Sequence, residues 1–299
     1  REAIMKLGYY PGCTLKTKAA NLEVAAMAAL DHLGVEYKEL GRWNCCGAVF
    51  SLADDDLIHQ VAPVRNLIRA AEEGCDTVVT ICSQCYNTLA RANKLVRDDE
   101  EKRDTLNRFM DEEPDYAGEV EVVHYLSLLR DQVGWEKLRE AVTNPLDGLQ
   151  VAPFYGCTLV RPEEVAIDGV DQEILEGFIA ALGAEPATFS AARECCGSYQ
   201  MIAHPEEGMN RAAKVIGAAN RSEADALILS CPMCEYNLGT RQGDVVAAHD
   251  GLSRVPTYYF TQLLGVALGL DSELCRLDLN GPAAQELLVD KKFIAAATV

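Results

Sequence analysis

The chain has 299 residues, of which 49% are hydrophobic and 24% charged, and its formal net charge is −19. This composition supplies enough apolar material for a folded core and excludes a disordered, collagen-like or mini-protein chain. The acidic balance argues against nucleic acid and anionic lipid surfaces as partners. No apolar run reaches the roughly 18 residues that a membrane span needs. Because residues 1–6 also lack the apolar core of a secretory signal, we expect a cytoplasmic, reducing location.

Strands and helices alternate along the first half of the chain. The predicted strands are residues 6–10, 35–40 and 76–81. The predicted helices are residues 21–33, which Gly34 ends, 54–73, which Pro63 kinks or splits, and 86–96. Residues 97–115 are so rich in charge that we expect a solvated helix and loop.

The second half repeats this order. Strands are predicted at 150–155 and 226–229, and helices at 171–182, 205–222 and 235–242. Residues 120–130 and 257–268 look like matching late elements of the two halves, and the segment after residue 271 is unassigned. The pattern predicts an α/β protein of two tandem, pseudo-symmetric domains, 1–146 and 147–299, each with a mostly parallel sheet flanked by helices.

The 12 cysteines fall into two matching sets of five, with Cys75 and Cys275 left over as small buried residues. Each set has a single cysteine after a strand, then a Cys-Cys-Gly turn, then a Cys-x-x-Cys motif. The sets are Cys13, Cys45, Cys46, Cys82 and Cys85, and Cys157, Cys195, Cys196, Cys231 and Cys234. An offset of about 150 residues between them indicates a duplicated domain rather than a short repeat.

Cysteines at strand ends that lead into helices are suited to holding an anionic metal centre. Free backbone N–H groups and the helix dipole stabilise thiolates there, and Gly12, Gly47, Gly156 and Gly197 let the backbone approach a bulky group. Structural disulfides fit the even count but not a reducing compartment. Zinc needs four ligands, usually from two close pairs, whereas each set has five cysteines and one Cys-x-x-Cys. An iron–sulfur centre fits best, although spacing alone does not say whether the fifth cysteine is a ligand.

These motifs resemble the duplicated CCG, or cysteine-rich, domain of the heterodisulfide reductase B subunit. The resemblance spans nearly the whole chain and rests on Cys45-Cys46-Gly47 with Cys82-Ser83-Gln84-Cys85, and on Cys195-Cys196-Gly197 with Cys231-Pro232-Met233-Cys234. It implies two non-cubane [4Fe-4S] clusters, each held by the five cysteines of one set, that face each other across the domain interface. It also implies cleavage of a disulfide between them, in methanogens the mixed disulfide of coenzyme M and coenzyme B.

The resemblance further implies partners that deliver electrons. The chain has neither a dinucleotide-binding glycine motif nor a ferredoxin cysteine run. A ferredoxin-like C subunit and a flavin-containing A subunit are therefore expected. From the resemblance to the methanogen enzymes we expect a His directly after the first cysteine of the second motif, and this chain has Thr158 there.

Side chains close to the motifs are candidates for binding the substrate. Lys16, Arg42, Arg161 and Arg193 can pair with an anion, or simply form surface ion pairs, and Thr158 takes the place of the expected His. Lys18 is open to the same two interpretations. Three tyrosines, Tyr9, Tyr10 and Tyr155, are expected to shield the clusters from water, and His124 to cap a helix or fill the core.

Two other functions compete with disulfide reduction. The first is a CCG-domain electron-transfer subunit of another anaerobic complex, of the glycolate- or lactate-oxidising, fumarate-reducing or benzoyl-CoA-reducing type. The second is a zinc-binding scaffold protein without catalytic activity. A panel of disulfides and a metal analysis distinguish the three.

Overall fold

The computed structural model describes residues 6–48, 56–168 and 173–296. These contain two four-stranded parallel sheets with the same strand order, β2-β1-β3-β4 and β6-β5-β7-β8. The first consists of β1 (Leu7–Tyr9), β2 (Lys38–Glu39), β3 (Thr77–Thr80) and β4 (Glu121–His124). The second consists of β5 (Gln150–Pro153), β6 (Glu185–Pro186), β7 (Ala226–Leu229) and β8 (Thr257–Tyr259). The predicted tandem α/β fold is confirmed.

Helices connect and cover the strands of the first sheet. They are α1 (Ala20–Leu33), the 3₁₀ turn η1 (Leu57–Gln60), α3 (Val61–Glu72), α4 (Ser83–Asp98), α5 (Glu100–Phe109), α6 (Tyr125–Leu128), the π-helical turn η2 (Leu129–Val133) and α7 (Trp135–Ala141). Helix α1 ends where predicted, because Gly34 adopts a φ of 70° and its N–H bonds back to Asp31 and Leu30. Pro63 lies in the first turn of α3, directly after the change from 3₁₀ to α geometry.

The second sheet has a corresponding set of helices. They are η3 (Glu163–Val165), α8 (Ile174–Ala181), α9 (Gln200–Ala203), α10 (Pro205–Arg221), α11 (Pro232–Glu235), the π-helical turn η4 (Tyr236–Thr240), α12 (Gln242–Ala248), α13 (Phe260–Ala267), α14 (Ser272–Cys275), η5 (Leu277–Leu279) and α15 (Pro282–Asp290). The last three lie in the segment that the sequence left unassigned. The starts of the predicted helices 54–73 and 171–182 lie outside the described residues.

Two predicted elements differ from the structure. The strand predicted over 35–40 is reduced to Lys38 and Glu39, because β2 is an edge strand that pairs only with β1. The helix predicted over 235–242 begins earlier, at Pro232, and turns π-helical at Tyr236. Helix α4, at the matching place in the first half, is continuous, so the π turn marks a local divergence between the halves.

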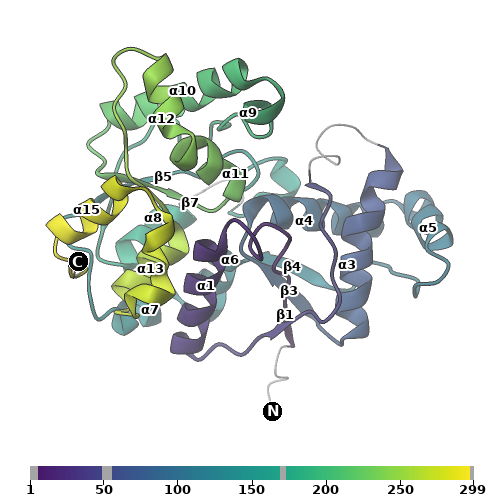
Figure 1. Cartoon of the computed structure of the whole chain (residues 1–299). Coiled ribbons are helices and arrows are strands. Elements are labelled where there is room, and N and C mark those ends of the chain that lie inside the picture. Colours follow the sequence, from purple (N-terminus) through teal and green to yellow (C-terminus); the bar gives the residue numbers. More distant parts are fainter. Residues whose placement is uncertain (1–5, 49–55, 169–172, 297–299) are drawn as a thin grey trace.

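The two halves share one buried core. Helices α1 and α13, far apart in sequence, lie side by side (Figure 1), and Thr261 donates a hydrogen bond to the Leu22 carbonyl across them. The predicted boundary at 146/147 lies between α7 and β5, and as a domain limit it stays a prediction. Among the described residues, no helix combines the length and the apolar character that crossing a bilayer requires.

Candidate metal centre

The first set of cysteines gathers at the carboxyl end of the first sheet. Cys13 follows β1, Cys45 and Cys46 follow β2, and Cys82 caps the N-terminus of α4, which contains Cys85. The Cys13 and Cys45 sulfurs are 3.6 Å apart, and those of Cys46 and Cys85 are 3.5 Å apart. Parallel strands bring such residues together because their carboxyl ends share one edge of the sheet.

The second set forms an equivalent group at the second sheet. Its thiols lie close enough to shift one another's pKa values: Cys157 with Cys195, Cys195 with Cys196, Cys196 with Cys234, and Cys234 with Cys231. As in the first set, the Cys-x-x-Cys motif begins at the N-cap of a helix, here α11.

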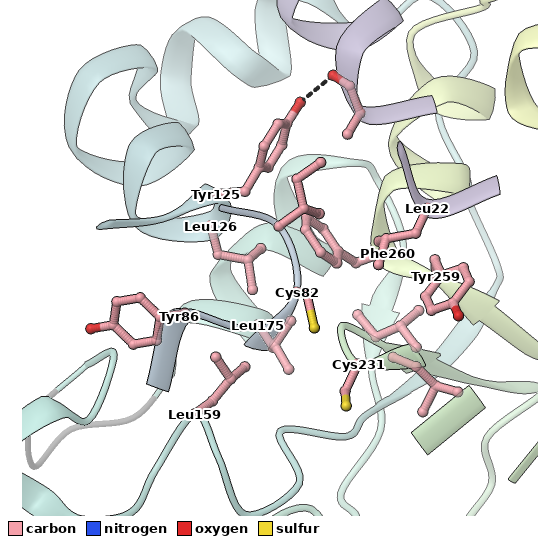
Figure 2. Close-up of a cluster of buried hydrophobic side chains, with 14 of the residues drawn as sticks. Leu22, Cys82, Tyr86, Tyr125, Leu126, Leu159, Leu175, Cys231, Tyr259 and Phe260 are labelled. Atoms are coloured by element: carbon pink, nitrogen blue, oxygen red, sulfur yellow. Dashed lines mark hydrogen bonds between the residues drawn. The ribbon is translucent and has the colours of Figure 1, made fainter. Parts of the chain in front are cut away.

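The two sets meet where β3 and β7 end. The thiols of Cys82 and Cys231 lie close enough to shift each other's pKa, and Figure 2 shows both side chains among the buried residues of the shared apolar cluster. Next to them, the Ser83 N–H donates to the Ser230 carbonyl over 3.2 Å. The first cysteines of the two Cys-x-x-Cys motifs therefore form the junction between the halves.

Donors surround the sulfurs. The backbone N–H groups of Gly197 and Ser198 each lie 3.4 Å from a cysteine sulfur of the second set. The side chain of Asn237 donates to the Cys196 sulfur over 3.5 Å. Thr88 has the same position in the first motif, three residues after the last cysteine, and lies close enough to Cys46 to lower its pKa. The sequence motifs did not single out this pair of polar residues, although their equal spacing is visible in the sequence.

Neighbouring thiols move one another's pKa values in opposite directions. Cys45 and Cys85 hold the pKa of Cys46 well below its usual range, and Cys157 and Cys196 lower the pKa of Cys195 to about 2. The neighbouring thiol of Cys46 raises the pKa of Cys85. Metal binding must release the remaining protons, so we expect acid to weaken it.

The residues present fit an iron–sulfur cluster in each half. Five thiols converge with N–H donors around them, and the backbone at residue 12 comes so close that a β-carbon there would lie 2.9 Å from the Cys85 sulfur. In contrast, no group of three or more His, Cys, Asp or Glu side chains within the described ranges is arranged to hold a single metal ion.

A cavity of about 640 Å³ opens beside the first set. All five cysteines of that set line one side, and residues of the second half, including Pro232, Met233 and Tyr236, line the other. The cavity therefore lies between the halves, next to the junction of the two sets.

The predicted substrate-binding residues lie outside the residues that line this cavity. Lys16 pairs with Glu23 and Glu39 at 2.6 and 2.7 Å, and Arg42 pairs with Glu72. The side chains of Arg161 and Arg193 are exposed. Thr158 is buried, and its carbonyl, like that of Arg161, accepts a hydrogen bond from Asn87 of α4, at 2.8 and 2.7 Å. Lys18 is the basic residue that does line the cavity.

His124 and the three tyrosines are buried. His124 caps α6 by accepting a hydrogen bond from the Leu126 N–H, and its other ring nitrogen lies 2.8 Å from the Ile81 carbonyl. Burial lowers its pKa to about 3, so the ring is neutral, as expected for a capping and core residue. Tyr9 and Tyr10 bond to Glu23 and to the Asn44 carbonyl, and Tyr155 bonds to Glu176.

Comparison with known proteins gives consistent results. Residues 7–90 and 151–239 each match the family model CCG, described as a cysteine-rich domain. The 8-methylmenaquinol:fumarate reductase membrane anchor subunit of Wolinella succinogenes is 32% identical over 92% of this chain and 96% of its own length. The B subunit of the ferredoxin/F(420)H(2)-dependent CoB-CoM heterodisulfide reductase of Methanosarcina acetivorans is 28% identical over 97% of this chain and 98% of its own length. A hypothetical protein from Helicobacter pylori, 13% identical, has the same fold, with a TM-score of 0.73 over 93% of this chain and 52% of that one.

Proposed function

This chain belongs to the family of duplicated cysteine-rich CCG domain proteins that includes heterodisulfide reductase B subunits, and on that premise we propose that it is the iron–sulfur subunit that reduces a disulfide. Each set of five cysteines holds one non-cubane [4Fe-4S] cluster, and the substrate binds between the two sets. The observation that carries this proposal is that the two sets meet where β3 and β7 end, where the Ser83 N–H donates to the Ser230 carbonyl and a cavity lined by both halves opens beside the cysteines.

Reduction of a disulfide breaks one S–S bond, consumes two electrons and two protons, and releases two thiols. An iron–sulfur cluster normally passes one electron at a time, so two clusters, one held by each set of cysteines, would supply the two electrons when bound. The chain itself supplies the enclosure: thiol ligands from both halves, N–H donors to the sulfurs, and an apolar wall that limits water.

The electrons come from partner proteins. The names of the Methanosarcina relatives describe subunits of multi-subunit heterodisulfide reductases, which supports a complex of the same kind here. We propose a ferredoxin-like C subunit and a flavin-containing A subunit as the donors.

The experiment is a single-turnover assay under anaerobic conditions. The metal-loaded protein is reduced chemically, mixed with symmetrical and mixed disulfides, and the released thiols are counted. We expect two thiols for each disulfide consumed, loss of this reaction in Cys231→Ser, and its retention in Cys275→Ser, a buried cysteine outside the sets. Release of no thiol from any disulfide would contradict the proposal.

A second function is favoured by the Wolinella relative, which is 32% identical to this chain and whose name describes a menaquinol:fumarate reductase. In that case the chain is an electron-transfer subunit of a fumarate-reducing type of complex. It then binds the same clusters but reduces no disulfide, and its reduced clusters are reoxidised when the partner enzyme receives fumarate.

A further inference from the structure

The cavity beside the first set has walls of two kinds. The cysteines and Gly47 form one side, and the remaining wall is largely apolar, with Ala19, Ala48, Ile202, Met233 and Tyr236 among its residues. Ile202, from α9, is 67% exposed, which is unusual for a large aliphatic side chain. The cavity measures about 640 Å³, and a cluster held by the five cysteines would fill the part next to them, so the substrate would occupy the remaining, largely apolar part. The cavity therefore suits a molecule with an apolar body.

Apart from the cysteines, the wall of this cavity carries few charges. Lys18 is the one cation among its lining residues, and in the part of the chain that the structure describes it has no carboxylate partner. Lys16, only two residues earlier, is neutralised by Glu23 and Glu39 outside the cavity. The one acid on the wall, Glu235, already accepts a hydrogen bond from the Thr240 hydroxyl at 3.2 to 3.3 Å.

This inference rests on the proposed function and names its substrate class. We propose that the cavity takes a disulfide with an apolar or aromatic body and a single anionic group, such as a carboxylate or sulfonate, which Lys18 binds. A second anionic group finds no cationic partner on the described wall and meets Glu235 instead. The predicted class thus excludes substrates with several negative charges.

The charge preference can be measured without turnover. Phenylbutyrate, phenylbutanol and phenylbutylamine share one apolar body and differ in the charge of the head group, and phenylsuccinate carries two carboxylates. Calorimetric titration of the metal-loaded protein gives the affinity for each. Because Lys18 is exposed, we expect phenylbutyrate to bind about two- to five-fold more tightly than phenylbutanol, and phenylbutylamine most weakly.

Three variants test the role of Lys18. In Lys18→Gln the advantage of phenylbutyrate over phenylbutanol should disappear, whereas Lys18→Arg should keep it. Lys16→Gln is the matched control, since it removes the same charge from a lysine outside the cavity, and it should keep the advantage as well. Both lysines are exposed, so these variants are expected to fold.

The inference is overturned if the three phenylbutyl compounds bind equally, if phenylsuccinate binds more tightly than phenylbutyrate, or if the preference survives in Lys18→Gln. These results are separable from the disulfide assay. A protein that reduces disulfides without the charge preference would contradict this inference alone, and one with the preference but no thiol release would contradict the proposed function.

Discussion

Asn87 joins the two halves at the metal centre, and replacing it by Leu tests this connection. Its side-chain amide donates to the carbonyls of Thr158 and Arg161 at 2.8 and 2.7 Å, directly after Cys157. The Thr158 bond is buried and the Arg161 bond partly buried. A buried carbonyl left without a donor costs about 1–3 kcal/mol, and loss of the second bond adds roughly 1 kcal/mol. We therefore expect Asn87→Leu to lower the free energy of unfolding by about 2–4 kcal/mol.

The variant should also weaken the second metal centre, because the segment that follows Cys157 is no longer held to α4. Asn93→Leu is the matched control. Asn93 also lies on α4, donates to the Val120 carbonyl at 2.7 Å and accepts from Tyr116, but all its partners are in the first half.

Denaturant unfolding measures the stability of both variants, and the rate of iron release to a chelator measures the centre. Both should be destabilised, but only Asn87→Leu should release about half of its iron faster than the unmodified protein. Equal rates of iron release from the two variants would refute the reasoning.

Three further results are expected. Asn237→Leu removes an amide donor from the Cys196 sulfur, so the midpoint potential of the second cluster should fall by roughly 20–60 mV. A redox titration followed by EPR measures this potential, and an unchanged value would count against the hydrogen bond. Burial lowers the pKa of His124 to about 3 from 6.5, so only the unfolded chain gains the proton as the pH falls through 6.5. The free energy of unfolding should therefore fall by about 2 kcal/mol by pH 5. In His124→Gln this loss of stability should be smaller, and an unchanged loss would show that the ring is charged in the folded protein. Gly12→Ala and Gly34→Ala both place Ala at a φ near 70°, but only at residue 12 does the new β-carbon come within 2.9 Å of a sulfur. Iron analysis should therefore show loss of the first cluster in Gly12→Ala alone, and full iron content there would contradict the close approach.

The duplicated fold could be predicted because local sequence patterns determine it. The β-branched run before Cys82 predicts a buried strand, and Gly34 marks the end of α1 where the structure places it. The two sets of cysteines were visible from spacing alone, and the structure brings each set together at the end of its sheet. Their role as metal ligands stays a prediction.

Features that depend on contacts between distant segments could not be predicted. Lys16 and Lys18 look equivalent in the sequence. In the structure, Glu39 of the neighbouring strand neutralises Lys16, whereas Lys18 lines the cavity. The contact of Cys82 with Cys231 depends on how the two sheets pack, which no local pattern records. The π-helical turn at Tyr236 could not be predicted either, because the matching helix of the first half, α4, is continuous.

The central claim is that each half holds a multi-iron cluster in its five cysteines and that the two clusters face each other. Anomalous diffraction at the iron absorption edge, from crystals of protein purified without oxygen, tests it most directly. The account predicts about eight iron atoms per chain, in two groups on either side of the Cys82–Cys231 junction. Zinc in place of iron, or iron groups that open onto unrelated faces of the molecule, would contradict it.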